Sequence, residues 1–317
     1  MNKFNIFISV LNWNSTEQTL NCIEMLQQQS YPYKQIVVVD NASQPAHLDF
    51  LKKELPKDVL LIESIENNGY ASGHILAVEV AKQQKADFIW ILNPDVLLQP
   101  NTIQLFLDAF QQFGEAIYGT VPLKNLPNQE LKDFPIKFHI KFFAQNFKEI
   151  LFNPFINRNF GELFPTLEPR FVSAISGSSI FLPISVIEKH GFMDCDYFMY
   201  SEEIDYCFRL ARNGVSCIIV PEAYVIHHDE GTSAQFTNLK NIINYYRLRN
   251  QLVRIHRYGS RFDLVRAVLK DIILVVSYPL MFGRNGVGRA RFGILAILDG
   301  LRGKLGKTFP PEDFLDN

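Results

Sequence analysis

Cysteine and long apolar runs are both scarce in this chain of 317 residues. Its cysteines form no Cys-x-x-Cys pair and no zinc-type spacing, so we expect reduced thiols instead of a disulfide framework or a zinc site. The most apolar late run, residues 272–282, has 11 residues, whereas a helix needs roughly 20 to span a bilayer. No signal-peptide pattern precedes the first strand-like segment, which predicts a cytoplasmic protein.

An excess of one charge is also absent from the chain as a whole, because 31 Lys and Arg face 33 Asp and Glu. The balance is uneven along the sequence. From Asn238 to the end, 14 basic residues stand against 6 acidic ones, a net charge of +8, while the remainder has 17 against 27, a net charge of −10. A basic tail beside an acidic body predicts an anionic partner for the tail: a membrane surface, a phosphorylated lipid or a nucleic acid.

The hydrophobic content of 47% is enough for one large or two moderate domains with a real core. Short apolar runs alternate with helical spacing near the start of the chain. The predicted elements are, in order, 4–11 (strand), 17–28 (helix), 36–39 (strand), 59–65 (strand), 72–84 (helix) and 88–92 (strand). Apolar strands joined by helices predict an α/β fold, Rossmann-like, with a mostly parallel sheet covered on both faces.

Polar residues follow three of the predicted strands. Asn12, Asp40 and Asp95 all come where an apolar run ends. Ligands of open α/β sheets bind beyond the carboxyl ends of the strands. The pattern therefore predicts a binding site at this edge of the sheet.

Two of these segments suit a nucleotide diphosphate. An acid at a strand end, here Asp40, can accept hydrogen bonds from a base or a ribose, although such an Asp is also a common turn or helix cap. Residues 67–74 read Asn-Asn-Gly-Tyr-Ala-Ser-Gly-His and lead into a helix. Small residues there let the backbone approach a diphosphate at a helix N-terminus, and the alternative is an ordinary glycine loop.

Candidate metal ligands occur after two strands. Asp95, at the end of Asn-Pro-Asp, can hold a divalent ion against a diphosphate, or the tripeptide can simply form a turn. His227 and His228 follow a strand-like run, where a neutral imidazole could be a further metal or diphosphate ligand. A structural role for the two histidines is the alternative.

The run 197–209 holds three acids flanked by aromatic residues and followed by a helical pattern. Transfer of a group to a hydroxyl needs a base for that hydroxyl, and a carboxylate near a desolvated cleft can serve. We expect Glu202 and Glu203 to face different ways on a helix, one into a cleft and the other capping or pairing. The alternative is an acidic first helical turn, which the helix dipole favours in any case.

Taken in order, these segments resemble the family 2 inverting glycosyltransferases with the GT-A fold. They are most similar to the rhamnosyltransferase-like subgroup of bacterial O-antigen and capsule synthesis. The resemblance spans roughly residues 4–250, and by composition it includes Gly-Leu-Arg-Gly at 300–303. It implies a nucleotide-sugar donor (dTDP- or UDP-linked, rhamnose among the candidates), Mg²⁺ or Mn²⁺ as cofactor and a lipid-linked or growing polysaccharide acceptor.

The resemblance also implies roles for individual residues. Asp40 would recognise the base, Glu203 would be the catalytic base with Glu202 as the other candidate, and the metal would be bound by Asp95 with His227 or His228. The nucleotide-sugar site would consist of Asn12, Asn14, Asp40, Asn41, Asn68, Gly69, Gly73, Asn93 and Asp95. The acceptor would meet Ser176, Gly177 and Asp205.

The sequence departs from the family pattern at four points. Asn93 replaces the first acid of the Asp-x-Asp motif, which leaves one carboxylate for the metal. Glu203 stands where Asp is commoner, so Glu202 remains a candidate base. His74 stands where relatives usually have Asn, and either histidine of the 227–228 pair could be the ligand.

The remaining parts of the chain divide into a connection and a tail. Residues 121–170 have no clear period, and we interpret them as a connection that covers or shapes an acceptor site. We expect a catalytic domain over 1–238 and a basic, amphipathic helical region over 239–317. Alternating basic and apolar stretches favour helices in a membrane interface, hence peripheral attachment to the inner face of the cell membrane. The alternative is a basic helical subdomain packed on the catalytic core.

Other functions fit the sequence less well. A nucleotidyltransferase would carry a Gly-rich, Arg-containing loop after the first strand, but the sequence there is Asn-Trp-Asn-Ser. A processive membrane synthase would carry Gln-x-x-Arg-Trp, which this sequence lacks. The lack of a known nucleic-acid motif argues against nucleic acid as the partner. A catalytically inactive membrane-associated scaffold of the same fold remains as the alternative function, and homo-oligomerisation is left open.

Overall fold

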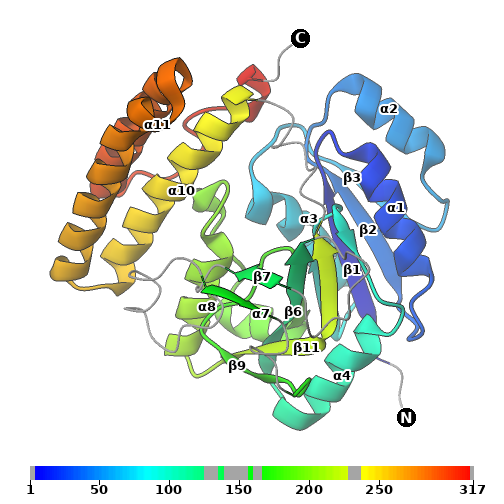
Figure 1. Ribbon diagram of the computed structural model, residues 1–317. Helices are drawn as coiled ribbons and strands as arrows, with labels where there is room; N and C mark the ends of the chain where they lie inside the picture. The colour runs from blue at the N-terminus through cyan, green and yellow to red at the C-terminus, as the bar shows by residue number, and fades with distance from the viewer. Residues whose placement is uncertain (1–3, 125–134, 139–155, 160–165, 228–236, 315–317) are drawn as a thin grey trace.

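The computed structural model describes residues 4–124, 135–138, 156–159, 166–227 and 237–314 (Figure 1). Within them the main sheet has nine strands in the order β3-β2-β1-β4-β10-β6-β11-β5, with β9 paired to β11. These strands are β1 (Ile6–Asn12), β2 (Gln35–Asp40), β3 (Leu60–Glu63), β4 (Phe88–Leu92), β5 (Val96–Leu97), β6 (Ala116–Lys124), β9 (Arg170–Val172), β10 (Ser179–Pro183) and β11 (Ser216–His227).

The strand directions confirm a mostly parallel sheet. β1 pairs in parallel with β2 and β4, β2 with β3, and β6 with β11. β10 lies antiparallel between β4 and β6, so the strands on either side of it share one direction. Only β5, β9 and β10 oppose the other six strands of the described sheet.

The four strands expected from apolar runs are all present. β1, β2 and β4 are buried on both faces, which is why they read as continuous apolar runs. β3 lies at the edge of the sheet, and its residues are exposed or half-buried.

Helices cover both faces of the sheet, as the alternation of strand and helix patterns predicts. They are α1 (Thr16–Gln27), α2 (Pro45–Glu54), α3 (Tyr70–Gln83), α4 (Thr102–Phe113), α7 (Ile184–His190) and α8 (Glu202–Arg212). Successive residues of a strand point to opposite faces. Ile89 and Ile91 of β4 accordingly pack in the core formed with α3, α7 and α8, and Trp90 packs in the core formed with α1, α2 and α4.

A third layer of helices follows β11. α10 (Thr237–Tyr258) and α11 (Arg261–Leu301) lie together on one side of the molecule and share their own apolar core (Figure 1). α11 contains non-helical backbone at Gly283 and folds back on itself there. A Cβ on Gly293 would meet a methyl of Val275 at 2.5 Å, so the two arms, 261–282 and 284–301, are in close contact. We refer to them as the α11 hairpin.

The sequence predicts basic stretches separated by an apolar run, and it does not predict that this region folds back on itself. The glycines and Pro279 let the chain reverse, and the small Gly293 lets the arms touch. In the part of the chain that the structure describes, no helix combines the length and apolarity needed to cross a membrane.

Most of the connection expected over 121–170 lies outside the described residues. Its described parts include the end of β6 and an antiparallel pair that the sequence did not predict, β7 (Pro135–Phe138) with β8 (Ile156–Asn159). Two short 3-10 helices, η3 (Cys195–Tyr197) and η4 (Pro311–Phe314), complete the described elements. All four cysteines are free, as expected.

Candidate active site

The ends of β1 and β2 are joined by their own polar side chains. Asn12 and Asp40 lie side by side in the register of the two strands, and Asn12 Nδ2 donates to Asp40 Oδ1 at 2.7 Å. The second oxygen of Asp40 accepts from the backbone N–H of Ser43 at 3.0 Å, and the residue is buried. Asp40 therefore holds the turn after β2 against β1, and its recognition of a base stays a prediction.

The loops beside this pair are fixed in a similar way. Asn14 has a left-handed backbone (φ 52°), and its side-chain oxygen accepts from the N–H of Gln44 at 2.7 Å. Buried Asn41 donates to Asn67 Oδ1 at 2.9 Å and to the carbonyl of Gly69. Asn68 is exposed and donates to Glu66. Most of these amides therefore order the loops at the edge of the sheet.

The two glycines expected to make room for a diphosphate lie against protein atoms. Gly69 has φ 93°, and a Cβ there would come within 1.9 Å of the carbonyl oxygen of Phe198. A Cβ on Gly73 would meet a methyl of Leu11 at 2.3 Å. Their small size thus lets α3 pack against β1 and the segment before α8, and these contacts give no support to a role next to a diphosphate.

The hydroxyl of Tyr70 is influenced by the charges of three carboxylates from distant parts of the chain. Burial raises the pKa of Tyr70 well above its usual value, and the charges of Glu202, Glu203 and Asp95 raise it further. The hydroxyl donates to the carbonyl oxygen of Gly177. The acids predicted from two separate motifs therefore lie in one neighbourhood.

Glu202 and Glu203 line the same cavity, and the expectation that one faces a cleft while the other caps or pairs stays a prediction. They are the first two residues of α8, and a cavity of about 360 Å³ extends around this end of the helix. Asn93, Ser176 and Gly177 line it as well, which brings a predicted donor residue next to two predicted acceptor residues. We call this space the carboxylate cavity.

The two glutamates differ in their surroundings. Glu202 is buried, and one of its carboxylate oxygens has no hydrogen-bond partner among the described residues. Burial, and then the negative charge of Glu203, raises the pKa of Glu202 well above its usual value. Glu203 is more exposed and lies against Gly177. A pair in which one acid favours its protonated form and its neighbour carries the charge can divide acid and base roles.

The segment before α8 is strained and held from outside. Phe198, Tyr200 and Ser201 all have left-handed backbone, with φ of 67°, 64° and 79°. Buried Asn250 of α10 directs its side-chain amide at the carbonyls of Tyr197, Met199 and Tyr200, at 2.7 to 3.1 Å. Such strain persists only where neighbouring groups fix it, and here α10 positions the start of α8.

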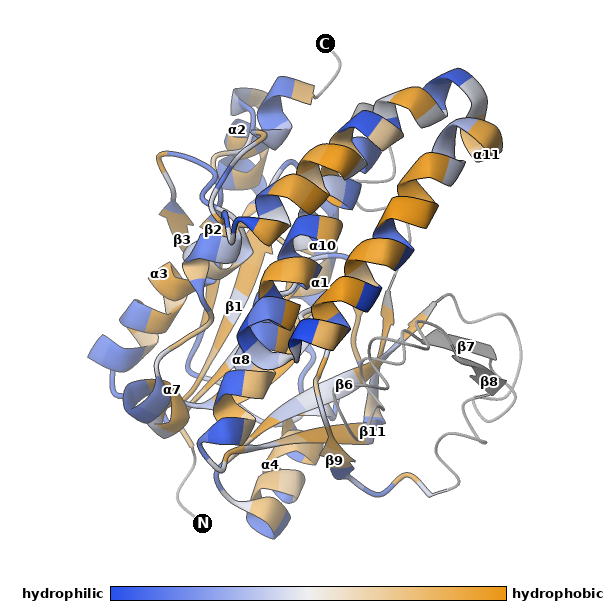
Figure 2. Cartoon of the chain, turned by 90° about the vertical axis from the view of Figure 1, so that its left-hand side faces the viewer, coloured by the Kyte–Doolittle hydropathy of each residue, from blue (hydrophilic) through white to orange (hydrophobic). Residues whose placement is uncertain are grey.

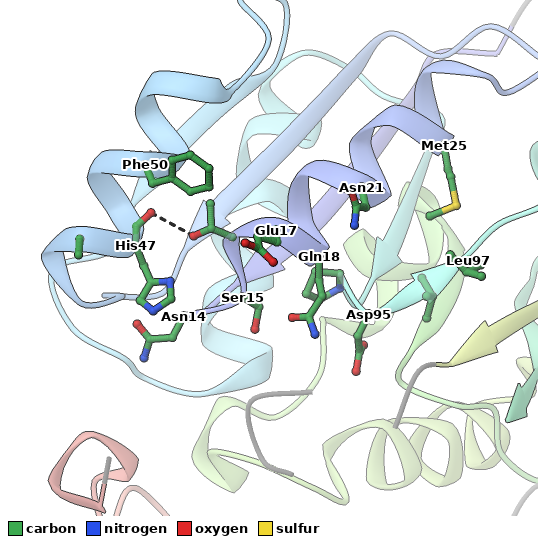
Figure 3. A pocket seen from close by; sticks show the side chains of 14 residues that line it. Asn14, Ser15, Glu17, Gln18, Asn21, Met25, His47, Phe50, Asp95 and Leu97 are labelled. Atoms are coloured by element: carbon green, nitrogen blue, oxygen red, sulfur yellow. Dashed lines mark hydrogen bonds between the residues drawn. The ribbon is translucent and has the colours of Figure 1, made fainter. Parts of the chain in front are cut away.

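A second, larger cavity of about 740 Å³ lies beside the carboxylate cavity. Figure 3 shows Asn14 and His47 at one end, Met25 and Leu97 at the other, and Asp95 between them. Its walls come from α1 and the two residues before it, from the N-terminal part of α2 and from residues 94–97. We call it the α1–α2 cavity.

Asp205 does not line either cavity, which corrects its placement at the acceptor. It lies one turn into α8, is buried, and accepts from Tyr197 Oη at 2.8 Å and Arg257 Nη1 at 3.0 Å. The periodicity of α8 turns this carboxylate toward α10, where it joins the two helices. His74 is likewise buried, with Nδ1 2.7 Å from Ser9 Oγ, and burial lowers its pKa to about 3.

Two of the three predicted metal ligands, Asp95 and His227, belong to strand ends that lie side by side. β11 ends at His227, whose backbone pairs with Val96, the residue after Asp95. The side chain of His227 and all of His228 lie outside the described residues. Among the described side chains, no three His, Cys, Asp or Glu gather as metal ligands would. One carboxylate at the wall of a cavity, where diphosphate oxygens could complete the coordination, still fits what Mg²⁺ and Mn²⁺ prefer.

Several residues of the site carried no functional prediction. Trp13, Tyr70 and Tyr200 line the carboxylate cavity, and each stands in or beside a motif whose asparagines, glycines or acids were the predicted functional residues. Arg254 is buried and donates to Ser201 Oγ at 3.3 Å. A basic residue in the tail gives no sequence signal for this, because the contact joins residues 53 positions apart.

Sequence comparisons relate the chain to one family of known proteins. The model of glycosyl transferase family 2 matches residues 7–166. Rhamnosyltransferase WbbL of Escherichia coli is 24% identical over 73% of this chain and 86% of its own length. N-acetylglucosaminyl-diphospho-decaprenol L-rhamnosyltransferase of Mycobacterium tuberculosis is 31% identical over 45% of this chain and 47% of its own.

A solved structure shows that the fold is shared. The crystal structure of GalNAc-T7 with UDP, GalNAc and Mn²⁺ superposes with a TM-score of 0.62 at 14% identity, covering 86% of this chain and 50% of that one. The chain has a GT-A-like α/β fold, and its family model spans half of its length. This protein therefore belongs to glycosyl transferase family 2.

Proposed function

We propose that this chain transfers a sugar, with inversion, from a dTDP- or UDP-sugar to a lipid-linked acceptor at a membrane surface. The observation that carries the proposal is that Glu202 and Glu203 line one cavity and Asp95 lines the cavity beside it. A donor-binding acid and a proton acceptor must lie within one substrate length of each other, and here both border neighbouring cavities.

The donor fits across the boundary of the two cavities. The nucleotide would occupy the α1–α2 cavity, whose volume of about 740 Å³ lies in the range of small-molecule sites. Its diphosphate would lie at Asp95, and the sugar would point into the carboxylate cavity. Rhamnose is a candidate sugar because two relatives are rhamnosyltransferases.

Asp95, with His227 or His228, would hold Mg²⁺ or Mn²⁺. The ion, when bound, supplies positive charge that stabilises the leaving diphosphate. The chain's own contribution is to fix Asp95 between β4 and β5, next to the end of β11.

Glu203 is proposed as the base. The acceptor oxygen attacks the anomeric carbon, the bond from that carbon to the diphosphate oxygen breaks, and the hydroxyl proton passes to Glu203. Because burial and the charge of Glu203 raise the pKa of Glu202 and so favour its protonated form, Glu202 is suited to donate a hydrogen bond in the same cavity.

The α11 hairpin supports peripheral attachment to the inner face of the cell membrane. Figure 2 shows apolar residues along the outer side of both arms. Leu280 and Ile273, both in α11, are 89% and 71% exposed. Apolar patches of this kind on a basic helical region mark interfacial membrane binding. Such attachment would bring the carboxylate cavity to a lipid-linked acceptor.

Thermal shift with UDP-, dTDP- and GDP-sugars tests donor binding, with and without Mn²⁺ or Mg²⁺. A donor at about 100 times its dissociation constant should add about 2.7 kcal/mol to the free energy of unfolding. We expect a metal-dependent shift with one nucleotide class that Asp95→Ala abolishes. Folded protein that no donor stabilises would contradict the proposal and favour the inactive scaffold.

A further inference from the structure

A third cavity of about 340 Å³ lies between α10 and the α11 hairpin, and its charged side chains are all basic. Lys240 and Arg247 reach it from α10, and Arg289 reaches it from the second arm of the hairpin. Asn244 and Tyr278 complete its polar lining. We call it the cationic cavity.

The three cations of this cavity are not neutralised within the described structure. No carboxylate of a described residue forms an ion pair with Lys240, Arg247 or Arg289. The two guanidinium groups rest on aromatic rings instead, Arg247 at 4.5 Å from the ring centre of Tyr200 and Arg289 at 4.3 Å from that of Phe282. Stacking of this kind leaves the N–H edge of a guanidinium available for an anion.

Asn244 supplies a further donor. Its side-chain oxygen accepts from Tyr278 Oη at 3.1 Å, which fixes the orientation of the amide. Its Nδ2 is buried and has no hydrogen-bond partner among the described residues. A buried donor without a partner costs free energy, so its retention beside three cations points to an acceptor that is supplied from outside.

The cationic cavity lies between the carboxylate cavity and an apolar surface. Tyr200 and Ile243 line both cavities, so the two spaces share a wall. On its other side Phe282, which stacks on Arg289, belongs to the turn of the α11 hairpin, where Leu280 and Met281 are exposed. Catalytic acids, cations and an apolar surface therefore follow one another in space.

We propose that the cationic cavity binds the phosphate groups of a lipid-linked acceptor. Lys240, Arg247 and Arg289 would bind the phosphate oxygens, with Asn244 Nδ2 as an additional donor. The sugar to be extended would then reach Glu203 past Tyr200, and the lipid chain would leave along the turn of the α11 hairpin. This inference rests on the proposed function, because it assumes that the carboxylate cavity receives the acceptor sugar.

Binding of a C15 prenyl diphosphate to the full chain tests the inference without any transfer reaction. The titration is made by calorimetry with UDP or dTDP present in excess, so that the donor site is occupied. We expect Arg289→Gln and the double variant Lys240→Gln/Arg247→Gln to weaken binding at least about tenfold, the loss of roughly one charge-assisted hydrogen bond. The matched control is Arg291→Gln, an exposed arginine two positions away that does not line the cavity.

Three results would overturn the inference. They are no binding of the prenyl diphosphate by the wild type, equal binding of the matched prenyl alcohol, and equal loss in Arg291→Gln. A fourth distinguishes the source of the phosphate: if Arg289→Gln loses binding to vesicles with anionic lipid but keeps the prenyl diphosphate, the cavity binds bilayer headgroups and the inference is wrong. Donor thermal shift in the same variants separates these failures from a failure of the proposed function.

Discussion

The α/β body and the C-terminal helices use apolar side chains in opposite ways. In the body, β1, β2 and β4 bury every apolar residue but Leu11, and polar residues at the strand ends bond to one another. Of the 20 exposed large hydrophobic side chains among the described residues, 14 belong to α11. The body is closed around its cores, whereas the hairpin presents apolar area outward. The difference suggests that the body carries out the chemistry and the hairpin meets a surface.

The two regions nevertheless depend on each other. Asn250 and Arg249 of α10 bond to the backbone of the strained segment before α8, and Asp205 of α8 bonds to Arg257. α10, which shares a core with the hairpin that presents the apolar surface, therefore also positions Glu202 and Glu203. Attachment and catalysis would be coupled through α10, and the following predictions test the two sides of this comparison.

The largest effect on stability is expected at Asp271, on the buried side of the hairpin. The residue is 2% exposed, and burial raises its pKa from 3.8 to about 7. A carboxyl with a raised folded-state pKa destabilises the protein as pH rises from about 4 to 7, and the penalty persists above that range. Asp271→Asn should remove it and add up to about 4 kcal/mol at pH 8. It should add little at pH 4.

Thermal unfolding of both proteins from pH 4 to 8 measures this directly. The two curves of Tm against pH should separate with rising pH. Parallel curves would show that ionisation of Asp271 does not destabilise the folded protein.

A smaller change, this time a loss of stability, is expected when the hydrogen bonds from α10 to the segment before α8 are removed. Asn250→Ala leaves the carbonyls of Tyr197, Met199 and Tyr200 without this donor, at a cost of about 1–3 kcal/mol. Because these carbonyls set the start of α8, donor turnover should fall by more than the loss of folded protein explains. The control is Gln251→Ala, a substitution of the next residue in the same helix, whose side chain is half-buried.

Kinetics and denaturant unfolding of the same samples give the turnover per folded molecule. This value shows whether turnover falls by more than the loss of folded protein. Unchanged turnover in folded Asn250→Ala would show that α10 does not determine the geometry of the catalytic site.

The smallest effect on folding and the most selective effect on attachment are expected at the turn of the hairpin. Leu280→Ser removes an apolar side chain that is 89% exposed, so stability should change by less than about 0.5 kcal/mol. Membrane burial of a Leu side chain contributes about 1.5–3 kcal/mol, so vesicle binding should weaken by about tenfold or more. Vesicle co-sedimentation measures it, with Ile65→Ser in the α/β body as the exposed control. Equal losses in both variants would contradict a specific membrane face.

The sequence predicted the body better than the hairpin, for physical reasons. Apolar runs buried on both faces identify parallel strands, so β1, β2 and β4 could be located, and Asp95 and Glu203 were placed by strand ends and by resemblance. The contacts of Asn250 and Arg254 could not be predicted, because they join segments about 50 residues apart through the backbone or a hydroxyl. The cationic cavity was also hidden, since its cations come from two helices whose packing depends on a reversal at Gly283.

Polar side chains that the sequence marks as candidate ligands also have partners within the fold. Asp40 and Asn12 bond to each other, and Asp205 bonds across to α10. A carboxylate in sequence looks the same whether it faces a ligand or braces a loop. Only the partners found in the fold distinguish the two cases.

The most direct test of the central claim compares Glu203→Gln with Glu202→Gln in release of nucleoside diphosphate from the donor that stabilises the protein. The account predicts that Glu203→Gln lowers the rate by about 10²–10⁴-fold, the usual contribution of a general base, while donor binding by thermal shift is kept. Glu202→Gln, which resembles the protonated form that burial favours, should retain most of the rate. Full activity in Glu203→Gln, or the larger loss in Glu202→Gln, would contradict the assignment of the base.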